Sequence, residues 1–437
     1  MENVAEKPER RYDIDWLRVI LFGLLIPFHV AIGVYWSTYG EGINPNLSDD
    51  PDDRKEVAEE GNDYTYDSVD PTSMFLHWMH QWRLAALFMI SGMGTAFAFK
   101  RRNWKNFLLE RLQRLLVPMF FGMWTVGFVG GIITGGVDLE GNSFIDTLIA
   151  FFVHVLFTSF LFWVPLFGKI IALGHLWFLW NLFLYSVLCI PIFHMVQKDS
   201  DGRLARFFRS AFTLKGGFGI LVLFPLLLSS TELAFKPWFP GFIGIGYEWI
   251  WYLVFFIFGY ICIVSRDLYY DFLSANRNII TILTMILTVA FVLIRLQQHE
   301  DGIPYMDGGW IENDILHNRM TILGCFIHSF HAWFWCLTVF AWGAHLLNKN
   351  SASLAYLNQG VYPFYIVHMP LTFAGLSIAK EFGFTGIPAV ILSCIFVSAG
   401  CWLIFETVRR TVVTRYLFGI KNTKQKKSVV SQDVNQL

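Results

Sequence analysis

The chain has 437 residues, of which 55% are hydrophobic, 18% are aromatic and only 15% are charged, and its formal net charge is −1. Long apolar runs recur along it, so the composition predicts a polytopic membrane protein and excludes a series of soluble domains. The nearly balanced charge gives no indication of a nucleic-acid partner. A polar N-terminal tail without a small-residue cleavage site after the first apolar run leads us to expect that this run stays as a membrane anchor.

About ten apolar segments are long enough to cross a bilayer as helices, which predicts an all-α, polytopic transmembrane helix bundle. In chain order they are 14–36, 74–98, 115–135, 175–196, 213–229, 247–265, 279–296, 319–346, 356–379 and 387–408. An eleventh apolar stretch, 147–166, is ambiguous by length and composition alone.

The distribution of Lys and Arg decides how this stretch is placed, because cytoplasmic loops collect positive charge. With ten spans and both termini in the cytoplasm, the outer segments hold only Arg54, Lys55, Lys169, Lys236 and Lys380. A full span at 147–166 would move the basic cluster at 203–209 to the outside. We therefore expect 147–166 to be a re-entrant or interfacial helix on the outer side.

The predicted organisation is a cytoplasmic tail at 1–13, a membrane domain at 14–408 and a second cytoplasmic tail at 409–437. The domain includes an outer loop at 37–73 that is rich in Asp and Glu. A solvated, flexible excursion is the favoured interpretation of this loop. A lid over an external entrance is the alternative.

The first span carries two ionisable side chains, which are costly inside a membrane unless they line a polar cavity or have partners. Arg18 lies near its inner end, and His29 follows eleven residues later. At about 100° per residue both side chains point from one helix face, roughly 16 Å apart along the axis. Asp15 is placed to pair with Arg18, and Pro27 removes a backbone donor near the imidazole. This face is either half of a catalytic tunnel or a structural arrangement of polar groups.

The second span begins with His77, His80 and Arg83 at i, i+3 and i+6, a spacing that stacks them along one helix face. They form either an interfacial girdle with the neighbouring tryptophans or a cationic rim that attracts an anionic or polyhydroxy ligand. The small residues at 91–94 that follow allow close contact with another helix.

Arg111 and Arg114 lie three residues apart in a basic segment on the predicted cytoplasmic side. Two guanidinium groups at this spacing make a phosphate clamp plausible. The alternative is that the pair only reflects the positive charge that any cytoplasmic loop collects.

Two later spans also carry polar side chains into the membrane. His175 lies at the outer start of the fourth span, and Tyr365 and His368 lie in the ninth. Pro363 and Pro370 bracket His368, so backbone groups are freed near its ring.

We expect no metal site. His328 and His331 lie at i and i+3 in the eighth span, but no third ligand has a matching spacing. The six cysteines sit singly in apolar stretches without CxxC spacing, so no disulfide framework is expected either.

Taken together, these segments resemble the type-3 family of integral-membrane acyltransferases over residues 10–410. The resemblance rests on Asp15-Trp-Leu-Arg18 and His29, Arg83 with the Phe88-to-Gly92 segment, Arg111-x-x-Arg114, His175-Leu-Trp-Phe-Leu and Tyr362-Pro-x-Tyr-x-x-His368-x-Pro. The placing of His80 and Arg83 is most similar to the branch that contains the succinyltransferase of periplasmic glucans. The chain departs from the family where a Met follows Ser91-Gly92 and where Met369, in place of a second His, follows His368.

The resemblance implies a multi-pass enzyme of the cell inner membrane that moves an acetyl or succinyl group from cytoplasmic acyl-CoA to a hydroxyl of an exported carbohydrate. Acyl-CoA would be a co-substrate, and no tightly bound cofactor is implied. The implied catalytic residues are His29, Arg18 and Asp15. The implied acyl-CoA ligands are Arg111 and Arg114. The implied acceptor or oxyanion pocket consists of His80, Arg83, His175, Tyr365 and His368.

Two alternatives remain open from the sequence. A secondary transporter or exporter of a small polar or glycan substrate would use the same polar face as a permeation path. Within the acyltransferase interpretation, His29 either acts as a base in direct transfer or carries the acyl group itself.

Overall fold

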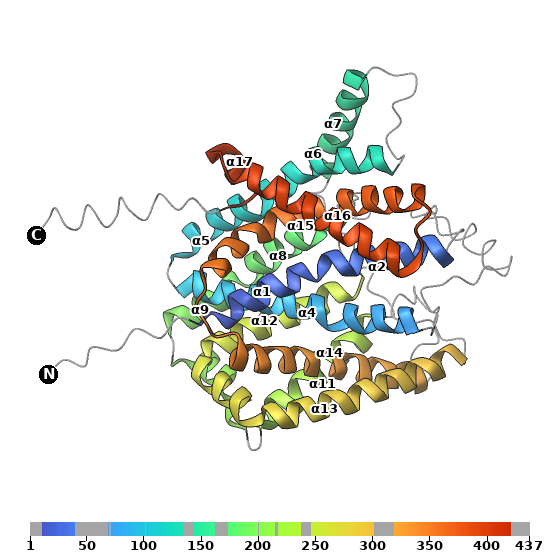
Figure 1. Cartoon of the computed structure of the whole chain (residues 1–437). Coiled ribbons are helices and arrows are strands. Elements are labelled where there is room, and N and C mark those ends of the chain that lie inside the picture. The colour runs from blue at the N-terminus through green and yellow to red at the C-terminus, as the bar shows by residue number, and fades with distance from the viewer. Residues whose placement is uncertain are drawn as a thin grey trace, which may run out of the picture.

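The computed structural model describes residues 11–39, 69, 71–100, 102–134, 144–161, 174–199, 201–214, 217–236, 246–300 and 319–420. Throughout this part of the chain the regular elements are helices, with no β-strand, as the long apolar segments predict (Figure 1). The prediction of an all-α membrane bundle is therefore confirmed.

Seven stretches of the described chain are long and apolar enough to cross a membrane. They are α1 (Asp13–Gly23) with α2 (Leu25–Tyr39), α4 (Pro71–Lys100), α5 (Trp104–Arg111) with η1 (Leu112–Leu116) and α6 (Val117–Ile133), α13 (Arg266–Glu300), α14 (Arg319–Leu346), α15 (Ala352–Glu381) and α16 (Gly386–Val408).

An eighth span results if Gly174–Leu188, which contains η3 (Gly174–Leu176) and α8 (Trp177–Leu188), is joined to α9 (Ile190–Lys198) across a 45° bend. Two shorter apolar helices, Gly219–Phe235 (η5 and α11) and α12 (Glu248–Val264), account for the remaining predicted segments. All ten predicted segments thus overlap helices, and the count of ten spans stays a prediction.

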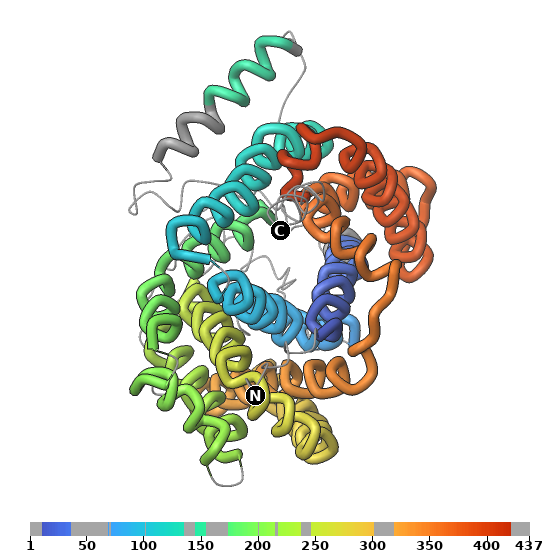
Figure 2. The backbone as a smooth tube through the Cα atoms, turned by 90° about the vertical axis from the view of Figure 1, so that its left-hand side faces the viewer, coloured from blue at the N-terminus to red at the C-terminus, as the bar shows by residue number. Residues whose placement is uncertain are grey.

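The helices form a ring when viewed along the bundle, with α1, α4 and α15 on its inner side (Figure 2). The start of α1 and the residues after α17 (Val412–Leu417) line one cavity, so the described chain begins and ends at the same end of the bundle. A chain that crosses a membrane an even number of times must have its two ends on the same side, so an even number of spans requires this placing of the ends. The side of the membrane on which this end lies stays a prediction.

Helix α7 (Phe144–Leu161) covers most of the ambiguous stretch 147–166. It projects away from the bundle, and its axis runs across the direction of the bundle helices (Figure 1). Its position relative to the bilayer stays a prediction.

Helices α4 and α12 pack with their backbones nearly in contact. A Cβ atom added to Gly92 would lie 1.9 Å from the carbonyl oxygen of Phe256, and one added to Gly259 would lie 2.0 Å from that of Met89. Only glycine permits such an approach. The expectation of close helix contact at the small residues 91–94 is confirmed, and this contact fixes α4, which carries His80 and Arg83.

Three predicted segments have wrong boundaries, and one of them, 279–296, begins 13 residues after the start of its helix at Arg266. The segment 213–229 begins six residues too early and ends six too early, because its helix runs from Gly219 to Phe235. Ionisable Glu232 ends the apolar window in the sequence, whereas its carboxylate is paired inside the protein. The segment 115–135 extends back to Trp104, which places Arg111 and Arg114 within a long helix.

Some expectations lie outside the described residues. These are the acidic outer loop from residue 40 to 68, the first ten residues, 162–166 and 421–437. The start of the predicted second tail is described and contains α17.

Candidate active site

A cavity of about 390 Å³ lies at the end of the bundle where the described chain begins and ends. Helices α1, α4, α5, α8 and α15 contribute to its wall. Four arginines and two carboxylates face it, which leaves an excess of positive charge: Arg18, Arg102, Arg111, Arg114, Asp15 and Glu110. Such a cavity attracts an anionic ligand.

Arg18 is held in the cavity wall by polar partners on two helices. Its Nη1 lies 3.3 Å from Oδ1 of Asp15, which confirms the ion pair expected from their spacing, and 3.5 Å from Oδ1 of Asn358 on α15. Both side chains are only partly exposed. The guanidinium group is therefore oriented by α1 and α15 together.

Arg111 and Arg114 are brought together in the same cavity, as their spacing suggests. Arg111 donates from Nη2 to Oγ1 of Thr95 at 3.0 Å, and Arg114 lies 3.4 Å from Oε1 of Glu110. A π-helical turn, η1, carries Arg114, and a proline, Pro118, follows it in the first turn of α6. Proline removes a backbone donor, and π-helical turns of this kind are frequent at functional sites.

Three aromatic rings form a layer beside this cavity. Phe22 and Phe178 line it, and their ring centroids are 6.0 Å apart. Each also contacts the ring of Tyr365, with centroids 5.8 Å away in both cases. His29 is not among the residues that line the cavity. These rings lie between the cavity and the histidines, and the tunnel from Arg18 to His29 stays a prediction.

Three histidines lie directly beyond this layer. The ring of His368 lies between those of His29 and His175, with centroid distances of 5.0 and 5.1 Å. The Tyr365 ring borders His175 at 5.7 Å and His368 at 5.9 Å. The fold thus joins four predicted site residues from α2, η3 and α15.

Backbone carbonyl groups fix the tautomers of His29 and His368. A carbonyl oxygen only accepts hydrogen bonds, so the ring nitrogen that bonds to it carries the proton. Nδ1 of His29 lies 3.0 Å from the Leu25 carbonyl, and Nδ1 of His368 lies 2.7 Å from the Tyr365 carbonyl. Nε2 of His368 is then an acceptor, and it lies 3.3 Å from Nδ1 of His29. The Leu25 carbonyl oxygen and Nε2 of His368 both accept from Nδ1–H of His29 and so orient its ring. Nε2 of His29 is therefore the unprotonated nitrogen.

His175 is fixed in the same way by a carbonyl group that a proline has freed. Its Nε2 donates to the Ile366 carbonyl at 2.9 Å. In a regular helix this carbonyl would bond to the N–H of residue 370, but Pro370 has none. The hydroxyl of Tyr365 donates in turn to the His175 carbonyl. The prediction that the prolines free backbone groups near His368 is thus confirmed at Ile366.

His80 and Arg83 contact the histidine cluster through Phe28, the neighbour of His29. The Arg83 guanidinium carbon lies 4.3 Å from the centroid of the Phe28 ring. The His80 ring stacks on the same Phe28 ring, with 5.7 Å between the centroids. Arg83 is 2% exposed, so its charge lies inside the bundle. The predicted outer residues His80 and Arg83 therefore lie one side chain away from His29.

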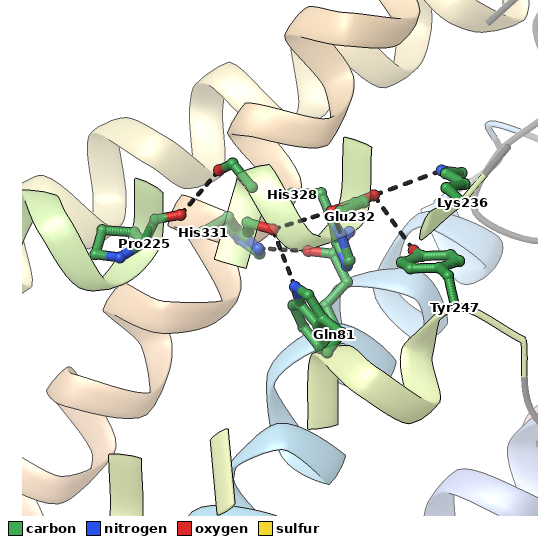
Figure 3. Close-up of polar contacts among 10 residues, drawn as sticks. Gln81, Pro225, Glu232, Lys236, Tyr247, His328 and His331 are labelled. Carbon is green, nitrogen blue, oxygen red and sulfur yellow. Dashed lines mark hydrogen bonds and ion pairs between the residues drawn. The ribbon is translucent and has the colours of Figure 1, made fainter. Parts of the chain in front are cut away.

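A second buried polar cluster was missed in the sequence (Figure 3). Glu232 on α11 lies 2.8 Å from Nδ1 of His328 on α14, and both are almost fully buried. Lys236, one turn after Glu232, was the signal that would have pointed to a paired carboxylate in the span.

The fold and the site define a multi-pass membrane enzyme with a basic cavity at one end and a histidine cluster beyond it. A family model described as an acyltransferase domain matches residues 11–406. The chain belongs to this family, the type-3 acyltransferases, and it is an acyltransferase. This result favours the acyltransferase prediction over the transporter alternative.

Proteins similar to the chain over nearly its whole length are named glucans biosynthesis protein C. Those of Salmonella paratyphi A and Salmonella agona are each 24% identical over 430 residues, which cover 94% of this chain and 95% of theirs. That of Salmonella typhimurium is 24% identical over 437 residues, which cover 96% of this chain and 97% of its own. No solved structure matches the chain significantly.

Proposed function

We propose that the chain is an O-acyltransferase that takes an acyl group from acyl-CoA in the basic cavity and transfers it to a carbohydrate hydroxyl, with His29 as the base. The observation that carries this proposal is the fixed tautomer of His29. Its Nδ1–H is held by the Leu25 carbonyl and faces Nε2 of His368, so its Nε2 is available to accept a proton.

The transfer is a direct exchange at the thioester. Nε2 of His29 removes the proton of the acceptor hydroxyl, and the oxygen attacks the thioester carbonyl carbon. The carbon–sulfur bond breaks, and the departing thiolate takes the proton from His29. While His29 is an imidazolium, its Nδ1–H donates to the Leu25 carbonyl and lies beside Nε2 of His368, which stabilises the positive charge.

The donor side is supported by the charge of the cavity. Arg111 and Arg114 would bind the phosphate groups of coenzyme A, since guanidinium groups pair strongly with phosphate. The pantetheine arm would pass Arg18 and reach the layer formed by Phe22, Phe178 and Tyr365. In this proposal the cavity faces the cytoplasm, and the membrane is the cell inner membrane.

The acceptor side is supported by the relatives and by the chemistry of the outer residues. The relatives are named for glucan biosynthesis, so we propose a glucan or another exported carbohydrate as acceptor. His80, Arg83 and His175 would surround the reacting hydroxyl, where cationic and hydrogen-bonding groups bind polyhydroxy ligands and the developing oxyanion. Acetyl and succinyl are the acyl groups to test.

The test is acyl transfer from labelled acetyl-CoA or succinyl-CoA to a glucan oligosaccharide by purified protein in proteoliposomes. We expect His29→Ala to lower the transfer rate at least about 100-fold, because general bases contribute roughly 10²–10⁴ in rate. His345→Ala is the matched control, since His345 is an exposed imidazole at the end of α14. Full activity of His29→Ala, at normal protein level, would refute the proposed mechanism.

A further inference from the structure

The buried carboxylate of Glu232 is surrounded by hydrogen-bond donors (Figure 3). Oε2 lies 2.8 Å from Nδ1 of His328 and accepts from the Ser329 hydroxyl at 2.9 Å. Oε1 accepts from the Tyr247 hydroxyl at 3.3 Å and lies 3.5 Å from Nζ of Lys236. An ionised carboxylate offers about four acceptor positions, and this set of donors fills them. Glu232 is therefore an ionised group whose bonds are used inside the protein.

This carboxylate fixes both the tautomer and the orientation of His328. An ionised carboxylate only accepts, so Nδ1 of His328 carries the proton and Nε2 is the acceptor. The ring also stacks on Trp251, at 5.0 Å between centroids and 15° between planes, and the Trp251 Nε1–H donates to Ser329 at 3.0 Å. A carboxylate that holds Nδ1 while Nε2 faces away is the arrangement found in catalytic triads.

His328 differs from His331, the next histidine on the same helix face. His331 uses both ring nitrogens inside the protein, since Nδ1 lies 2.5 Å from Oε1 of Gln81 and Nε2 accepts from Trp335 at 3.0 Å. Nε2 of His328 is fully buried and has no hydrogen-bond partner among the described residues. A buried polar atom left without a partner costs stability and calls for a functional explanation.

His80 supplies a second such atom on the side of the acceptor pocket. Its Nδ1 is buried and has no hydrogen-bond partner within the described part of the chain. Gln81, the residue after His80 on α4, contacts His331, which lies one turn after His328 on α14, with 2.5 Å between Oε1 and Nδ1. His80 and His328 therefore lie on adjacent helices within about one helical turn of each other. His80 also stacks on Phe28, beside His29.

We propose that Nδ1 of His80 and Nε2 of His328 form a subsite that binds a hydroxyl of the acceptor carbohydrate adjacent to the one that reacts. A hydroxyl group donates one hydrogen bond and accepts others, so it satisfies one acceptor nitrogen and one donor nitrogen at the same time. Glu232 is the positioning residue, because it acts only through the His328 ring. This inference rests on the proposed transfer to a carbohydrate and extends it to a second contact.

The experiment measures kinetics of Glu232→Gln and His328→Gln with acyl-CoA and a glucan oligosaccharide in proteoliposomes. We expect KM for the oligosaccharide to rise about tenfold in each variant, the size of one lost hydrogen bond. The KM for acyl-CoA and its slow hydrolysis without acceptor stay within about twofold, because the donor cavity lies elsewhere. His331→Gln is the matched control, and its KM for the oligosaccharide should not change.

A second measurement does not depend on transfer. The oligosaccharide alone should raise the unfolding temperature of the wild type in detergent, and it should not do so for His328→Gln. This measurement tests binding of the oligosaccharide at the subsite even if Glu232→Gln does not accumulate as a folded protein.

The outcomes separate the two proposals. Transfer with an unchanged KM in both variants, or with the same rise in His331→Gln, would overturn the subsite and keep the proposed function. A shift in unfolding temperature that depends on His328, without any transfer, would support the subsite and overturn the proposed function. Neither transfer nor a shift would overturn both.

Discussion

The crossing of α4 and α12 leads to a sharp prediction for Gly92→Ala. The new Cβ would lie 1.9 Å from the carbonyl oxygen of Phe256, whereas ordinary contacts lie at 3.4 Å or more and tight ones at 3.0–3.4 Å. The partner atom belongs to a helix backbone, so no side-chain rotation relieves the clash. The two helices must separate by about 1 to 1.5 Å at this point.

The expected cost follows from this separation. Overpacking costs roughly 1–3 kcal/mol where side chains can adjust. Here a backbone has to move and neighbouring contacts lose dispersion energy. We therefore expect Gly92→Ala to lower the free energy of unfolding by about 3 kcal/mol or more. Gly259→Ala should cost a similar amount, and the double variant should cost less than the sum, because one separation accommodates both methyl groups.

The measurement is unfolding of the purified protein in mixed micelles with increasing SDS, followed by circular dichroism. Gly23→Ala is the control, since a Cβ there meets no atom within 4 Å, and alanine is expected to be neutral or to stabilise by up to about 1 kcal/mol. Equal stability of Gly92→Ala and Gly23→Ala would refute the argument. So would strictly additive costs of Gly92→Ala and Gly259→Ala.

Two further predictions concern the donor cavity. Arg111→Ala should raise KM for acyl-CoA by roughly ten- to a hundredfold, since hydrogen bonds to charged groups contribute about 1.5–3 kcal/mol; a donor KM that does not change, measured by transfer at varied acyl-CoA, would contradict a phosphate-binding role. Phe178→Ala should open the layer between the cavity and the histidines, so hydrolysis of acyl-CoA in the absence of acceptor should increase severalfold; release of coenzyme A at the wild-type rate would show that the ring does not restrict passage.

The sequence predicted the helices well because membrane spans are long and strongly apolar. Each span can therefore be recognised from its own residues, without information on the rest of the chain. The pair Asp15 and Arg18 was predictable for a similar reason, since their spacing along one helix sets their geometry. The layer formed by Phe22, Phe178 and Tyr365 was not predictable. It is made by three helices that meet in space, and aromatic residues occur throughout the chain.

The roles of the prolines were predictable only in part. Pro370 indicates that some carbonyl group nearby lacks its helical donor, and the helical spacing points to Ile366. Pro370 does not indicate which side chain donates a hydrogen bond to that carbonyl oxygen. That His175 does so depends on how η3 packs against α15, which a single sequence does not encode locally.

Glu232 shows why the predicted span ended too early. A hydropathy window assigns each charged residue the cost of an isolated ion in hydrocarbon, so a carboxylate marks the end of a span. The actual cost depends on donors contributed by other segments, here His328, Ser329 and Tyr247, together with Lys236 one turn away. With these donors the carboxylate is stable inside the bundle. The carboxylate fixes the ring of His328 within about one turn of His80 on the neighbouring helix. Two unpaired ring nitrogens so placed make a binding role a better explanation than the carboxylate alone would.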